Sequence, residues 1–90
     1  MDSLNFKFNN LNDMKEFAKY LSKELENFGD KDNSKMVNQF SYNSYTTSSE
    51  YLGEFRILLE DLKKQKVLED ENIRLQVDAA IKAINKAFRS

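Results

Sequence analysis

A chain of 90 residues with a formal net charge of −1 is long enough for one small domain, and it contains neither cysteine nor histidine. It therefore has no thiolate for a disulfide or a zinc site, and it lacks the usual general base and the commonest metal ligand. These absences exclude Ser-His-Asp and Cys-His catalysis, and they predict a non-enzymatic protein with no cofactor and no bound metal.

Charge and hydropathy narrow the classes of partner. Nucleic-acid-binding proteins carry a basic surplus that displaces counterions, whereas this chain has 14 basic and 15 acidic residues. The longest aliphatic run, at residues 57–59, is too short to cross a bilayer, and the first residues lack the pattern of a secretory signal. We therefore expect a cytoplasmic protein with no membrane partner, in keeping with the missing cysteines.

The first predicted elements are a strand and a helix. Apolar and polar residues alternate over residues 3–9, which predicts a half-buried strand. Apolar residues then recur every three or four positions and predict a helix at about residues 11–28. Asn10 or Asn12 is expected to cap the start of this helix, and Gly29 to end it in a left-handed conformation.

A polar loop and a second strand are expected next. Residues 29–35 read GDKDNSK, a composition typical of turns. Phe40 and Tyr42 alternate with polar neighbours and predict a strand at about residues 36–43, with Tyr42 pointing inward. The order strand, helix, strand would make the two strands parallel, with the helix as a right-handed crossover.

Two helices complete the predicted domain, at about residues 48–65 and 70–89. Thr47 and Glu50 have the spacing of a capping box at the start of the first one. The predicted fold class is therefore α+β, a single domain over residues 1–90 in the order β-α-β-α-α with two short strands packed on three helices. An all-α three-helix bundle is the alternative.

The polar loop has oxygen-bearing residues in the alternation of a calcium site, namely Asp30, Asp32 and Ser34. An EF-hand loop that starts at Asp30 needs glycine at its sixth position and glutamate at its twelfth, where this chain has Lys35 and Ser41. We therefore predict a solvated turn. The acidic pairs elsewhere are adjacent along helices and do not face each other, so they do not indicate acid catalysis.

Apolar residues outside the main helical stripes suggest a second surface, so that the helix at 48–65 is either sandwiched within the fold or meets another chain. Two of them lie one turn apart on the predicted helix at 48–65, and two more lie on the helix at 70–89. Tyrosines near the end of the second predicted strand also suit a protein interface, because tyrosine buries a large amphipathic area. The candidate protein interface comprises Tyr42, Tyr45, Gly53, Ile57, Leu75 and Ala79.

The leading functional hypothesis is a small cytoplasmic module for protein–protein interaction. Its partner would be another protein, as for an immunity or antitoxin-like protein, or a second copy of itself in a homodimer. One alternative is a nucleic-acid-associated regulator that uses the Lys63–Lys66 cluster. A second alternative is a small-molecule binder with a pocket between the sheet and the helices, lined by Tyr42, Tyr45 and Tyr51.

Overall fold

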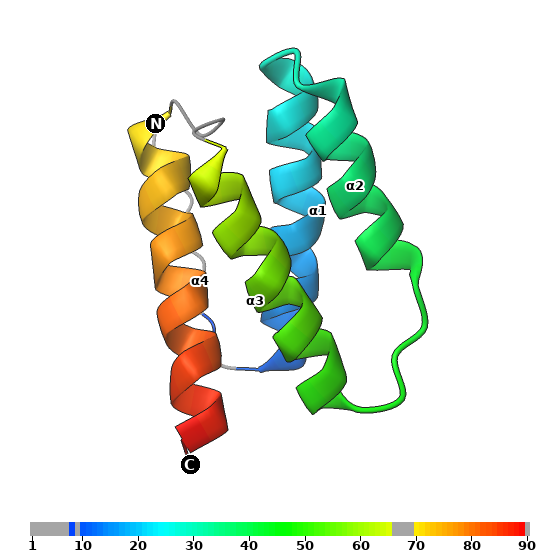
Figure 1. Cartoon of the computed structure of the whole chain (residues 1–90), viewed down its shortest axis with the longest axis vertical. Coiled ribbons are helices and arrows are strands. Elements are labelled where there is room, and N and C mark those ends of the chain that lie inside the picture. The colour runs from blue at the N-terminus through cyan, green and yellow to red at the C-terminus, as the bar shows by residue number, and fades with distance from the viewer. Residues whose placement is uncertain (1–7, 9, 66–69, 90) are drawn as a thin grey trace.

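The computed structural model describes residues 8, 10–65 and 70–89, and the regular elements in them are all α-helices. They are α1 (Leu11–Asn27), α2 (Lys31–Tyr42), α3 (Ser48–Lys64) and α4 (Glu71–Arg89). The helices run alternately up and down, with α3 lying between α4 and the α1–α2 pair in the view of Figure 1. The architecture of the described residues is an all-α four-helix bundle.

The predicted α+β class is wrong. The strand expected at 36–43 lies almost entirely inside α2, and the loop expected at 29–35 contributes the first residues of the same helix. The strand expected at 3–9 falls, apart from Phe8, outside the described residues. The all-α alternative fits the described residues, which form one helix more than the expected three-helix bundle.

The sequence pattern did not predict a helix at α2, because polar residues occupy half of the positions that this helix buries. Its buried residues are Asn33, Ser34, Val37 and Phe40, which recur with the helical period, whereas Tyr42 is 82% exposed and not inward. The two polar side chains are satisfied by tertiary hydrogen bonds: Ser34 Oγ donates to the carbonyl of Ser22 on α1 (2.7 Å). Asn33 Nδ2 donates to Asp30 Oδ2 (2.8 Å) and to Gln65 Oε1 (3.0 Å) beyond the end of α3.

A tight turn joins α1 to α2. Gly29 has φ 84°, the amide of Gly29 donates to the carbonyl of Glu26, and the amide of Asp30 donates to the carbonyl of Leu25. These are the two bonds of a Schellman motif, so the expected role of Gly29 is confirmed. Asp30 then caps α2 through the amide of Asn33, so three residues reverse the chain and the two helices form an antiparallel hairpin.

Side-chain caps also define the starts of the other helices. Asn10 accepts the amide of Asp13 at the start of α1, which decides between the two expected caps. Thr47 accepts the amide of Glu50 (3.1 Å), and the carboxylate of Glu50 returns to the amide of Thr46 (2.9 Å). The predicted helix-starting role of Thr47 is thus confirmed, with the return bond one residue earlier than in the standard capping box.

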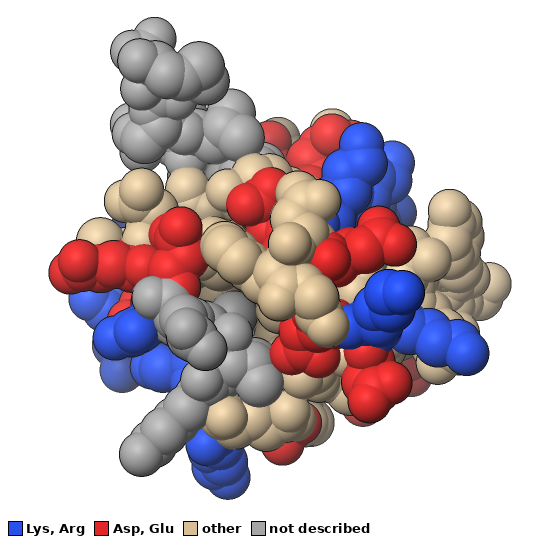
Figure 2. All heavy atoms as spheres, turned by 90° about the horizontal axis from the view of Figure 1, so that it is seen from above, with Lys and Arg blue, Asp and Glu red and all other residues tan. Residues whose placement is uncertain are grey.

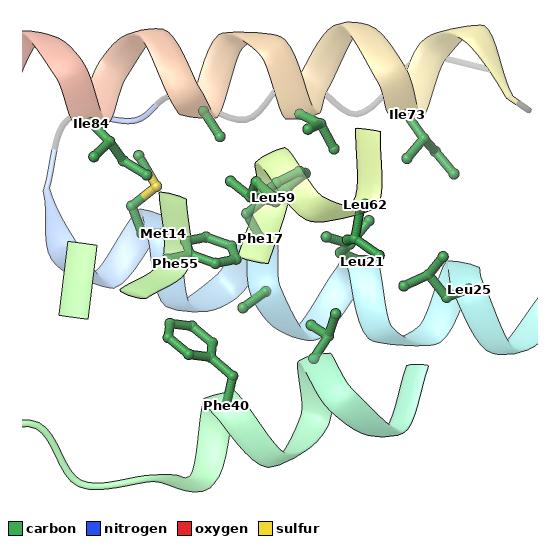
Figure 3. Packing of buried hydrophobic residues seen from close by; sticks show 14 of the residues in the cluster. Met14, Phe17, Leu21, Leu25, Phe40, Phe55, Leu59, Leu62, Ile73 and Ile84 are labelled. Atoms are coloured by element: carbon green, nitrogen blue, oxygen red, sulfur yellow. The ribbon is translucent and has the colours of Figure 1, made fainter. Parts of the chain in front are cut away.

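The hydrophobic core lies where the four helices meet. Figure 3 shows side chains of α1, α3 and α4 converging on the bundle axis, with Phe40 of α2 directed toward Phe55 of α3. The rings of Phe40 and Phe55 stack at 5.0 Å, and Phe17 lies 6.2 Å from Phe55. These contacts join the two helical hairpins. In the part of the chain that the structure describes, no helix has the length and apolar character needed to span a membrane.

Candidate functional site

A polar groove runs along the outer side of the α1–α2 hairpin. It consists of two adjoining hollows, one of about 770 Å³ along the middle of the hairpin and one at the end where α2 stops. The hollows share Glu16, Lys19 and Tyr42, so they form one continuous surface, which we name the lysine groove. Its charged lining residues are Lys15, Lys19, Lys23, Lys31, Lys35, Glu16 and Glu26.

The lysine groove concentrates positive charge on a chain that is nearly neutral. Five lysines against two glutamates give the groove a net charge of +3, whereas the whole chain carries −1. On α1 the lysines lie at positions 15, 19 and 23, one helical turn apart, so they follow one side of that helix. The groove therefore presents a row of cations to any molecule that lies along the hairpin.

The fold makes little use of these cations. Lys19 Nζ lies 3.8 Å from Glu16, and both side chains are more than half exposed, so the ion pair contributes little to stability. Lys31 is the first residue of α2, where the positive end of the helix dipole disfavours a cation. Lys31 and Lys35 are both exposed and have no ion pair within the described residues. Contacts among the described residues therefore do not account for the placement of these two lysines.

Three tyrosines meet at the end of the lysine groove. The hollow there, which we name the tyrosine hollow, is lined by Tyr42, Tyr45 and Tyr51 together with polar residues of α1 and of the α2–α3 connection. Tyr42 is 82% exposed, whereas Tyr45 is partly buried and its hydroxyl donates to the carbonyl of Phe40 (3.1 Å). Lys15 Nζ lies 5.9 Å from the centre of the Tyr51 ring. The fold thus brings the three tyrosines to one hollow, although the sheet that was expected to form one wall of their pocket does not occur in the described residues.

Tyr51 is the most constrained of the three. Its ring is 4% exposed and packs at 4.8 Å from Phe40 and 5.3 Å from Tyr45. Its Oη atom is buried and has no hydrogen-bond partner among the described residues, an arrangement that costs about 1–3 kcal/mol. Burial, and to a smaller extent the neighbouring Tyr45, raises the pKa of Tyr51 to about 12. The hydroxyl is therefore a neutral donor at physiological pH.

Gly53 lies at the seam between α3 and α4. A β-carbon built there would have the Cζ atom of Phe88 as its neighbour, at 3.9 Å, so the glycine faces a side chain and not a second backbone. Arg56 spans the same seam, with Nη1 donating to Asn85 Oδ1 (2.7 Å) and the guanidinium lying 5.1 Å from the centre of the Phe88 ring. This contact between helices of the same chain accounts for the surroundings of Gly53.

The other candidate interface residues on α3 and α4 are exposed but separate. Ile57 is 61% exposed and Leu75 is 60% exposed, and Ala79 is exposed as well. The pairing of Arg56 with Asn85 sets the antiparallel register, so Leu75 lies about 13 Å along the axis from the level of Ile57. The structure therefore brings Tyr42 and Tyr45 to one site and leaves these apolar residues apart from it.

The lysine cluster at the end of α3 is partly engaged. Lys63 forms an ion pair with Asp78 of α4, Lys64 is exposed, and Lys66 lies outside the described residues. Figure 2 looks onto the end of the bundle where α3 stops and shows acidic and basic side chains interspersed over the part that the structure describes. This end does not present the single-sign surface that phosphate binding favours.

The sequence pattern did not indicate the lysine groove, because residues 29–35, which hold Lys31 and Lys35, were expected to form a loop and not a helix. The i, i+4 spacing of Lys31 and Lys35 has meaning only when both residues belong to one helix. The turn at Gly29 could have indicated the arrangement, since a helix end followed at once by a capping aspartate is typical of a helical hairpin.

The fold and the groove together define an all-α bundle with a cationic surface on its first hairpin. No protein-family model, curated protein or solved structure matches the chain.

Proposed function

We propose that the protein is a non-enzymatic module that binds another protein along the lysine groove. The observation that carries this proposal is the concentration of five lysines along a groove that also contains the exposed Tyr42, on a chain of net charge −1. Protein interfaces commonly combine an aromatic anchor with a charged rim, and the charges steer the partner and select its register. The partner surface that complements this groove is acidic.

The composition of the groove supports a protein partner over a nucleic acid. Glu16 and Glu26 lie among the lysines and would repel a continuous phosphate backbone. The groove also contains no arginine, because the first arginine of the chain is Arg56, and arginine is the residue best suited to bidentate phosphate contacts. A cytoplasmic location, suggested by the absence of cysteine, belongs to the same proposal.

Binding of a small molecule is the second candidate function, and one specific observation favours it. The tyrosine hollow joins three aromatic side chains to Lys15, and one of them, Tyr51, has a buried hydroxyl with no partner among the described residues. Small-molecule sites also combine apolar walls with a few placed polar groups. Thermal shifts with a library of organic acids would test this alternative.

Charge reversal tests the main proposal. The variant Lys31→Glu/Lys35→Glu removes the positive α2 side of the groove, and Lys82→Glu/Lys86→Glu is its matched control, with two exposed lysines at the same spacing on α4. Partners are captured from nuclease-treated extract of the source cells with the wild-type chain and then purified for affinity measurements. We expect the groove variant to bind the captured protein about tenfold more weakly and the control to bind it unchanged.

Two results would contradict the proposal. Equal affinity of both variants for the partner would place the binding surface elsewhere on the molecule. Capture that disappears with nuclease treatment would assign the lysines to a nucleic acid. Circular dichroism spectra and melting temperatures of both variants establish that each remains folded.

A further inference from the structure

We infer that the tyrosine hollow is a carboxylate-binding subsite, in which Lys15 and the Tyr51 hydroxyl hold an aspartate or glutamate side chain of the bound partner. This inference rests on the proposed protein-binding function and names the contact that anchors the partner at one end of the lysine groove.

The unsatisfied hydroxyl of Tyr51 is the first support. Tyr45, its neighbour, donates its hydroxyl proton to the carbonyl of Phe40, whereas Tyr51 has no acceptor among the described residues. Tyr51 is one of the residues that line the hollow, and its hydroxyl is a buried donor without a partner among the described residues. Because buried polar groups in proteins are nearly always hydrogen-bonded, this unpaired donor indicates a ligand that brings an acceptor. The packed ring holds the hydroxyl in place before that ligand arrives.

Charge is the second support. Lys15 lies beside the Tyr51 ring and has no ion pair within the described residues, so its cation is free to meet an anion. Asn12 and Asn43 also line the hollow and can donate amide protons. A site with several donors and an unpaired cation complements an oxyanion, and hydrogen bonds between charged groups and such donors are strong.

The surrounding charges favour a carboxylate over a phosphate. Lys19 lines the same hollow but is paired with Glu16, whose carboxylate lies in the lining as well. One unpaired lysine balances the single charge of a carboxylate, whereas a phosphate monoester carries nearly two charges and would also face Glu16. The continuity of the hollow with the lysine groove lets further acidic residues of the same segment meet Lys23, Lys31 and Lys35.

A designed peptide probes the subsite directly. The probe is a capped alanine-based helical peptide with glutamate at every fourth position, which matches the spacing of the lysines on α1, and its control has glutamine at those positions. Binding to the full chain is followed by calorimetry and by amide chemical shifts. We expect the glutamate peptide to bind, the glutamine peptide to fail, and the shifts to include the amides around Lys15 and Tyr51.

Variants separate the subsite from the groove. Tyr51→Phe removes the hydroxyl and leaves the ring, and Lys15→Gln removes the cation of an exposed residue. We expect each to weaken binding of the glutamate peptide about tenfold. Tyr51→Phe should keep or raise the melting temperature, because it deletes an unpaired buried group, so a loss of binding could not be attributed to unfolding.

Three outcomes would overturn the inference. If both variants bind the peptide like wild type while Lys31→Glu/Lys35→Glu binds it more weakly, binding along the lysine groove is supported and the carboxylate-binding subsite is refuted. If inorganic phosphate produces the same chemical shifts and the glutamate peptide produces none, the hollow takes phosphate and not a carboxylate. If neither probe binds at millimolar concentration, the subsite is refuted, and capture from cell extract still decides the proposed function by itself.

Discussion

The substitution Gly53→Ala tests how well the α3–α4 seam is understood. Gly53 lies inside α3, and its added β-carbon would stand 3.9 Å from Phe88 Cζ with no other atom beyond the neighbouring turns within 4 Å, which is ordinary van der Waals contact. Alanine is favoured over glycine in a helix interior by about 0.8–1.0 kcal/mol. We therefore expect the free energy of unfolding to rise by about 1 kcal/mol and the melting temperature by about 4–8 °C.

The other glycine of the chain provides the matched control. Gly29 has φ 84°, a region in which a side chain is strained, so Gly29→Ala should lower the free energy of unfolding by about 1–2 kcal/mol although it has open space around it. Thermal and urea unfolding, followed by circular dichroism, measure both variants. A Gly53→Ala protein less stable than wild type would refute the reasoning, because it would show that the seam is closer packed than the structure describes.

Two further predictions concern the start of α3. Thr47→Ala should lower the free energy of unfolding by about 0.5–2 kcal/mol through loss of the cap, while Ser48→Ala, one residue further along, should change it little; equal effects on thermal unfolding would contradict the capping role. Because burial raises the pKa of Tyr51 to about 12 from its ordinary value of 10.0, the unfolded chain releases this proton first as pH rises. Stability should be unaffected by Tyr51 below pH 10 and should fall between pH 10 and 12, by about 1.4 kcal/mol per pH unit for this group. Urea unfolding across this range should show a shallower loss for Tyr51→Phe, and parallel curves would refute the pKa assignment.

The candidate site was only partly accessible from the sequence. Tyr42 and Tyr45 were expected to contribute to an interface, and with Tyr51 they were expected to line a pocket, because tyrosine is common in such places. The three side chains come together because of the connection between α2 and α3, in which the hydroxyl of Tyr45 donates to the carbonyl of Phe40. The lysines were overlooked, since a stripe on α1 and two residues on α2 become one groove only when the hairpin is formed.

Local sequence determined the helices whose apolar residues recur without interruption. The stripes of α1, α3 and α4 bury residues such as Phe17, Phe55 and Val77. Because capping is decided within one turn of chain, the cap at Thr47 could be identified and the cap of α1 narrowed to Asn10 or Asn12. Composition alone also removed the thiol and imidazole chemistry from consideration.

Tertiary contacts determined that residues 31–42 form the helix α2 and not a loop followed by a strand. Asn33 and Ser34 occupy buried positions of this helix, so the apolar pattern is too weak there to show the helical period, and the alternation of Phe40 and Tyr42 over a few residues imitates a strand. The burial of Asn33 and Ser34 is stabilised by hydrogen bonds to Gln65 and Ser22. These two partners are distant in sequence and become neighbours when the hairpin packs on α3. The groove that we propose as the binding surface is a consequence of that packing.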